Sequence, residues 1–185
     1  MPREFLQPDS PPARLTNFRE RWRLLQRSGL DALCLLRFDA RLRAMRGHEF
    51  VGLLYETLRP EALVAGYDFR FGRQGEASAE LLVSEGRRLG FSVEVIAPVL
   101  EGAARVSSSA VREALSRGDL AQAEAQLGRP YSIRGRVVAG ERLGRQLGYP
   151  TANLRLERRR SPLGGIFAVR VHGVGERPRP GVASL

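Results

Sequence analysis

The first two thirds of the chain alternate between short apolar runs and longer stretches with helical periodicity. Apolar side chains recur at intervals of three and four residues in five stretches, which predicts helices at 17–27, 48–58, 77–90, 109–117 and 120–127. Three apolar runs of strand length predict buried strands at 31–38 ("DALCLLRF"), 61–66 ("EALVAG") and 91–99 ("FSVEVIAPV"). Strands that alternate with helices are typical of a parallel, doubly wound α/β sheet.

After Pro130 the pattern changes to alternating strand-like runs separated by Gly and Pro turns. These runs are "YSIRGRVVAG" (131–140), "TANLRLE" (151–157) and "GGIFAVRVHGV" (164–174). They predict a small antiparallel β-barrel without helices. The sequence therefore predicts two domains, 1–128 and 129–185. Because the second domain is small and its barrel incomplete, we expect it to be the less stable half and to self-associate through an open barrel edge.

Composition places the chain among globular proteins, with 43% hydrophobic and 27% charged residues. No apolar run is long enough for a membrane span and no signal-peptide segment is present, so the cytoplasm is the expected location. The single cysteine, Cys34, lies in an apolar run and is expected to be a small buried residue. The net charge of +10 raises the alternative of a basic nucleic-acid-binding protein. The arginines are scattered, however, with one cluster at 157–160, and aromatic residues for base stacking are few.

The segment "SSSAVR" (107–112) lies where a loop enters a predicted helix. Ser109 is a good candidate for the N-cap. Arg112 would then occupy the first helical turn, where the helix dipole disfavours a cation. A phosphate at this terminus would reverse that, because N–H groups, serine hydroxyls and a guanidinium all bind phosphate. From the residues alone, capping and phosphate binding both remain open.

Two further loops carry candidate chemistry. "GYDFRFG" (66–72) follows a predicted strand, at the edge where open α/β sheets bind ligands. Its two phenylalanines either face a ligand or anchor the loop on the core. The loop "LGRQLGYPTANL" (143–154) combines glycines, Arg145, a hydroxyl and a carboxamide in one short segment.

Five segments in this order and spacing resemble the bifunctional bacterial riboflavin kinase/FAD synthetase family: "PREF" (2–5), "GYDFRFG", "SSSAVR", "LGRPYSIRGRVV" (127–138) and "GRQLGYPTANL". The resemblance implies a nucleotidyltransferase-like α/β domain that adenylylates FMN to FAD. It also implies a riboflavin-kinase-like β-barrel that phosphorylates riboflavin to FMN. Both reactions use ATP and Mg²⁺.

The resemblance also implies roles for particular residues. Thr151 and Asn153 would contact Mg²⁺ and the ATP phosphates, and Mg²⁺ prefers such hard oxygen ligands. The ATP-binding residues implied are Ser108, Ser109, Arg112, Gly140, Gly144, Gly148, Thr151 and Asn153. The flavin-side residues implied are Arg3, Phe5, Asp68 and Phe69.

The chain also departs from the family pattern. Family members carry an H-x-G-H motif, whereas the two histidines here, His48 and His172, are expected at a helix start and on a surface strand. Ala139 replaces a histidine that is common before Gly140. The family's catalytic glutamate lies beyond the segments matched here, so no catalytic residue is identified. We expect a chain truncated at both ends that forms neither FAD nor FMN alone. A non-catalytic ATP- or flavin-binding remnant is the alternative.

Overall fold

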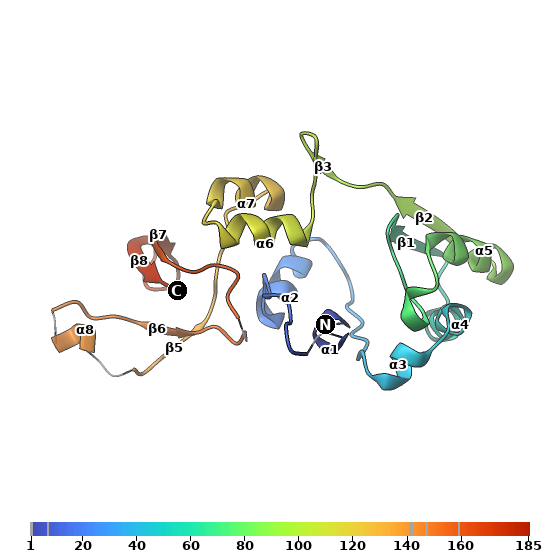
Figure 1. Cartoon of the computed structure of the whole chain (residues 1–185), viewed down its shortest axis with the longest axis horizontal. Helices are drawn as coiled ribbons and strands as arrows, with labels where there is room; N and C mark the ends of the chain where they lie inside the picture. Colours follow the sequence, from blue (N-terminus) through green and yellow to red (C-terminus); the bar gives the residue numbers. More distant parts are fainter. Residues whose placement is uncertain (1, 7, 141–142, 147, 159) are drawn as a thin grey trace. The chain divides into compact units, whose positions relative to one another are not determined.

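The computed structural model describes the backbone of residues 2–6, 8–140, 143–146, 148–158 and 160–185 (Figure 1). The chain forms two compact units. The first comprises Met1–Pro12 and Cys34–Arg105, and the second comprises Ala13–Leu33 and Val106–Leu185. The predicted domain boundary after residue 128 stays a prediction, since the compact units divide the chain at other points. The second unit therefore includes a helix from the N-terminal part of the chain.

The first unit is a mixed α/β structure. Its elements are α1 (Pro2–Leu6), α3 (Ala40–Ala44), α4 (Gly47–Leu58), β1 (Ala62–Gly66), the 3₁₀ turn η1 (Arg73–Gly75), α5 (Ala79–Leu89), β2 (Ser92–Ile96), β3 (Leu100–Glu101) and β4 (Ala104–Arg105). Strands β1 and β2 pair in parallel over five residues, and β3 pairs with β4 as a short antiparallel hairpin. The predicted helices at 48–58 and 77–90 and strands at 61–66 and 91–99 are confirmed, with ends shifted by a few residues.

The core of this unit forms where α4 and α5 meet the β1–β2 pair. Val51, Phe71, Leu82 and Phe91 are buried there. The backbone of α5 approaches β2 closely at Gly86, because a Cβ there would lie 2.8 Å from the Phe91 carbonyl oxygen. The apolar side chains whose spacing predicted these elements are therefore the ones that pack together in the core.

The predicted strand at 31–38 is wrong. This segment has no strand assignment, Leu35 and Leu36 are 66% and 51% exposed, and Cys34 is exposed rather than buried. An apolar run becomes a strand only where a second strand satisfies its backbone N–H and C=O groups. No described strand pairs with this run, and the apolar pattern alone could not reveal that. The parallel sheet among the described residues consequently has two strands, and the doubly wound arrangement is not observed.

The second unit contains three longer helices and two strand pairs. Its elements are α2 (Phe18–Gln26), α6 (Ser108–Ser116), α7 (Leu120–Leu127), β5 (Arg136–Val138), α8 (Leu143–Gln146), β6 (Asn153–Arg155), β7 (Ile166–Val171) and β8 (Arg179–Ser184). The predicted helices at 17–27, 109–117 and 120–127 are confirmed. Helices α6 and α7 bury Val111, Ala114, Leu115 and Ala123 against Leu163.

The predicted barrel differs from what the second unit shows. Strand β5 pairs with β6 and β7 pairs with β8, both antiparallel, and the described strands form no closed barrel. The four-residue helix α8 interrupts a region predicted to lack helices. Each strand of a two-stranded sheet leaves one edge unpaired within that sheet, so self-association through such an edge remains a prediction. None of the helices that the structure describes is long and apolar enough to cross a membrane.

Candidate functional site

The β5–β6 hairpin presents the "PTAN" segment at its loop end. Asn153 is the first residue of β6 and pairs with Val138, the last residue of β5. Thr151 lies two residues before the strand, and both side chains are exposed. The hairpin therefore holds the hydroxyl and the carboxamide on one accessible segment next to the connecting loop.

Two of the predicted glycines lie directly against these side chains. A Cβ at Gly140 would overlap Asn153 Nδ2, and a Cβ at Gly144 would lie 3.0 Å from Thr151 Oγ1. Tyr149 N donates to Gly144 O over 2.7 Å, which closes the loop between them. Gly148 has φ of +80°, a backbone conformation that favours glycine. Gly140 and Gly144 therefore lie where a larger side chain would collide with Asn153 or Thr151, and Gly148 lies where the backbone conformation favours glycine.

The side chains of Thr151 and Asn153 carry oxygen atoms of the kind that Mg²⁺ prefers. The Asn153 nitrogen faces Gly140, and its oxygen lies farther away, 3.8 Å from the same Cβ position. A hydroxyl and a carboxamide oxygen supply hard ligands without negative charge. No cluster of three or more His, Cys, Asp or Glu that could hold a metal occurs in the part of the chain described.

The "SSSAVR" segment forms the start of α6, and its N-cap is Ser107 rather than Ser109. Ser107 Oγ accepts a hydrogen bond of 3.1 Å from Ala110 N. Ser108 and Ser109 fall inside the first helical turn and are exposed. The cap lies two residues earlier than predicted because the helix itself begins at Ser108. Capping and phosphate binding are compatible here, since different serines would perform them.

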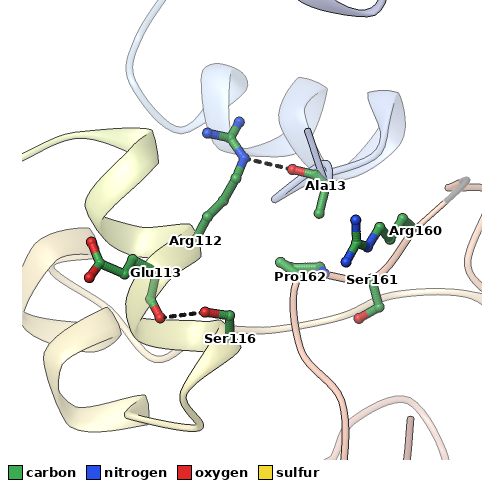
Figure 2. A pocket seen from close by; sticks show the side chains of 7 residues that line it. All are labelled: Ala13, Arg112, Glu113, Ser116, Arg160, Ser161 and Pro162. Carbon is green, nitrogen blue, oxygen red and sulfur yellow. Dashed lines mark hydrogen bonds between the residues drawn. The ribbon is translucent and has the colours of Figure 1, made fainter. Parts of the chain in front are cut away.

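Arg112 makes hydrogen bonds within the second unit. Its Nε donates to Ala13 O over 2.7 Å and its Nη1 donates to Ser108 O over 2.9 Å. Figure 2 shows the guanidinium directed toward Ala13, beside an open pocket of about 300 Å³. The pocket is lined by Ala13, Arg112, Glu113, Ser116, Arg160, Ser161 and Pro162. Of the predicted phosphate group, Arg112 lines this pocket, whereas Ser108 and Ser109 are not among the lining residues.

The contacts of Arg112 predict that its replacement affects stability. Arg112→Ala is expected to lower the free energy of unfolding by about 1.5–3 kcal/mol, the range for a hydrogen bond to a charged group. Thermal or urea unfolding measures this, and Arg117→Ala is a suitable control because its ion pair with Glu113 is exposed at both ends. Unchanged stability combined with weaker nucleotide binding would instead favour a role in holding phosphate.

The loop "GYDFRFG" turns back at Asp68, which forms an ion pair with Arg105 at the end of β4. The hydrogen bond from Arg105 holds the pKa of the Asp68 carboxyl below its usual range. The same guanidinium lies 4.9 Å from the centre of the Tyr67 ring. Arg105 was not predicted as part of this loop, although its position just before "SSSAVR" was a visible signal of positive charge.

The aromatic side chains of "GYDFRFG" and "PREF" have different exposures. Phe71 is buried in the core and Phe69, 38% exposed, stacks on it with ring centres 5.2 Å apart. Phe5 meets Phe38 edge to face at 5.6 Å. Phe71 therefore anchors the loop, and Phe69 keeps an accessible part. The side chains of Arg3 and Arg145 lie outside the described residues.

The remaining predictions concern histidines and the basic cluster. His48 lies in the first turn of α4, as expected, and His172 is exposed just after β7. In the cluster at 157–160, Arg158 is buried and paired with Glu20 over 2.6 Å. This arginine is therefore not available to a nucleic acid. The segment "NFRE" (17–20) was a recognisable capping-box signal for Glu20, but its partner 138 residues away was not predictable.

Comparisons with known proteins show which family the chain belongs to. The family model described as FAD synthetase matches residues 1–110, and the model described as riboflavin kinase matches residues 127–185. The chain belongs to the bifunctional riboflavin kinase/FMN adenylyltransferase family. This is a family of transferases, whose members are named for phosphorylating riboflavin and for adenylylating FMN.

Several curated relatives are similar over the whole chain. Identity is 45% with the bifunctional riboflavin kinase/FMN adenylyltransferase of Escherichia coli (strain K12), and 42% with that of Pseudomonas fluorescens. The chain is covered completely and spans 59% of the length of both relatives. A solved structure described as a macrolide-efflux protein from Streptococcus pneumoniae has a TM-score of 0.83 and 32% identity, over 100% of this chain and 60% of that one. The efflux named there belongs to that protein.

Proposed function

We propose that a protein of the relatives' full length carries out both reactions, the phosphorylation of riboflavin to FMN and the adenylylation of FMN to FAD, with ATP and Mg²⁺ in each, whereas residues 1–185 alone are expected to form neither product. Membership of the family supports the two activities. The observation that carries the proposal is the fit of Gly140 against Asn153 and of Gly144 against Thr151. These contacts place backbone without side chains beside the Thr151 hydroxyl and the Asn153 carboxamide, whose oxygens are hard ligands of the kind that Mg²⁺ prefers.

In this proposal each group of residues has a separate task. Thr151 Oγ1 and Asn153 Oδ1 hold Mg²⁺ and the phosphates of ATP for the kinase reaction, with Gly140, Gly144 and Gly148 keeping the loop clear of side chains. The Mg²⁺ ion would neutralise phosphate charge when bound. Ser108, Ser109 and Arg112 steady the triphosphate in the adenylyl transfer. Arg3, Phe5, Asp68 and Phe69 lie on the flavin side.

A binding experiment on the chain tests the kinase part. Mg·ATP is expected to bind the wild-type chain, and Thr151→Val and Asn153→Ala are each expected to weaken that binding by roughly tenfold, since each removes one hydrogen bond or ligand to a charged group. Titration calorimetry with and without Mg²⁺ measures both effects. Thr57→Val, at an exposed position of α4 outside both predicted phosphate sites, is the matched control and is expected to bind Mg·ATP as the wild type does.

The outcomes separate the proposal from its alternative. Mg·ATP binding that is insensitive to Thr151 and Asn153 would contradict the assignment of the loop. Tight binding of Mg·ATP and riboflavin without turnover, in a protein of the relatives' full length, would instead support a non-catalytic ligand-binding role.

A further inference from the structure

The N-terminus of α2 holds both strands of the β5–β6 hairpin at the end away from its loop. Asn17 Nδ2 donates to Leu156 O over 3.2 Å, just after β6, and to Arg134 O over 3.5 Å, two residues before β5. Glu20 Oε1 accepts a hydrogen bond of 2.6 Å from Arg134 N. One helix end therefore contacts the entry and the exit of the hairpin simultaneously.

A buried ion pair completes these contacts. Arg158 Nη2 donates to both carboxylate oxygens of Glu20, over 2.8 and 2.6 Å, and the two side chains are 1% and 9% exposed. Arg158 Nη1 donates to Tyr131 Oη over 3.0 Å, and that hydroxyl donates to Leu15 O. Burial raises the pKa of Tyr131, so its hydroxyl stays protonated and remains a donor. We refer to Asn17, Glu20, Tyr131, Arg134 and Arg158 as the clasp.

Three features of the clasp are not expected to increase the stability of the fold. A buried ion pair often contributes no more to stability than apolar residues of the same size would. Arg158 Nε is buried and has no hydrogen-bond partner among the residues that the structure describes. Glu157, directly before it, has φ of +51°, an uncommon conformation for a residue other than glycine. The bend at Glu157 is what turns Arg158 back toward Glu20 after β6 ends.

The clasp and the "PTAN" segment occupy opposite ends of the same short strands. Arg136 pairs with Arg155 at the clasp end, and Val138 pairs with Asn153 at the loop end. Leu156 follows Asn153 by three residues, about 10 Å along an extended chain. A three-residue strand pair has few contacts of its own to fix its direction, so the held end determines where Asn153 and Thr151 lie.

We propose that Glu20 and Arg158 are positioning residues for nucleotide binding by Thr151 and Asn153. This inference rests on the proposed function of that loop. Glu20 belongs to the stretch that the FAD synthetase family model matches, whereas the hairpin belongs to the stretch matched by the riboflavin kinase model. A residue of the adenylyltransferase segment thus controls the geometry of the kinase segment.

The test uses the intact chain and a variant without buried charge. Breaking one side of a buried pair destabilises strongly, because the other charge stays buried. In Glu20→Gln/Arg158→Met no charge remains, and the Gln carboxamide can still accept from Arg134 N. We expect this double variant to recover most of the stability lost by Arg158→Met alone. We also expect its β5 and β6 amides to exchange roughly tenfold faster and its Mg·ATP affinity to stay roughly tenfold below that of the wild type.

Controls make the result decisive. Glu113→Gln breaks an exposed ion pair in α6 and is expected to change neither amide exchange in β5 and β6 nor Mg·ATP affinity. Arg158→Lys is expected to fold and to bind Mg·ATP with intermediate affinity, because lysine keeps the charge but cannot contact both carboxylate oxygens of Glu20 as arginine does. Recovery of nucleotide affinity together with stability in the double variant would overturn the inference, as would unchanged amide exchange. If Thr151→Val and Asn153→Ala leave Mg·ATP binding unchanged, the proposed function of the loop fails. A third outcome is possible, in which Thr151→Val and Asn153→Ala weaken Mg·ATP binding while the double variant shows faster amide exchange but wild-type Mg·ATP affinity. That outcome would overturn only the positioning role of Glu20 and Arg158.

Discussion

Replacing Leu115 with alanine is expected to lower the free energy of unfolding of the second unit by about 2–5 kcal/mol. Leu115 is fully buried on α6, where it packs in a cluster with Val111, Ala123 and Leu163. The substitution removes apolar contact area and leaves a cavity that close-packed neighbours cannot fill. Urea unfolding followed by circular dichroism measures the change in midpoint and in slope.

A matched substitution in the next helix provides the control. Leu120 is 39% exposed at the start of α7, so Leu120→Ala is expected to lose clearly less stability than Leu115→Ala. Equal losses for the two variants would mean that the α6–α7 core does not have the packing described here. Because Tyr131 packs against the same cluster, Leu115→Ala is also expected to loosen the segment that leads into β5.

Replacing Gly140 with alanine is expected to weaken Mg·ATP binding by roughly 10- to 100-fold. The new Cβ would occupy the position of Asn153 Nδ2, so the carboxamide has to leave its place at the start of β6. The loss matches a single contact to a charged group, at about 1.5–3 kcal/mol. Titration calorimetry with Mg·ATP measures it.

Gly175→Ala is the control for this prediction. Its Cβ would meet only Arg179 Nε, at an ordinary contact distance of 3.8 Å, and it lies outside the candidate loop. We expect wild-type affinity from this variant. If Gly140→Ala binds Mg·ATP as tightly as Gly175→Ala does, Asn153 does not hold the nucleotide in the orientation proposed.

The helices were predictable because the information that specifies them is local. Periodic apolar residues and nearby capping residues located α2, α4, α5, α6 and α7 within a few residues. The cap of α6 was placed two residues late because three consecutive serines offer equivalent side chains. Which serine caps the helix depends on where the backbone enters it, and composition does not specify that.

The candidate loop was also predictable in part. Glycine has no side chain that could collide with a neighbour, and Pro150 restricts the backbone of the residue before it. The segment from Gly140 to Asn153 was therefore recognisable as a specifically shaped loop. The family resemblance gave this signal a proposed function, and the family models confirm the family. The contacts of Gly140 with Asn153 and of Gly144 with Thr151 came only from the folded hairpin.

The sequence by itself determined the five longer helices, the strands of the parallel β1–β2 pair and the family, and it predicted the residues of the candidate loop. The short helices α1, α3 and α8 were not predicted. The tertiary structure decided which apolar runs became strands, since "DALCLLRF" has the composition of a strand but no described partner for its backbone. It also decided the burial of Arg158, which in the sequence is one of several exposed-looking arginines, and its pairing with Glu20 across 138 residues. Strand pairing and buried ion pairs join residues far apart in the chain. Their free energy depends on a partner's position in space, which no local pattern encodes.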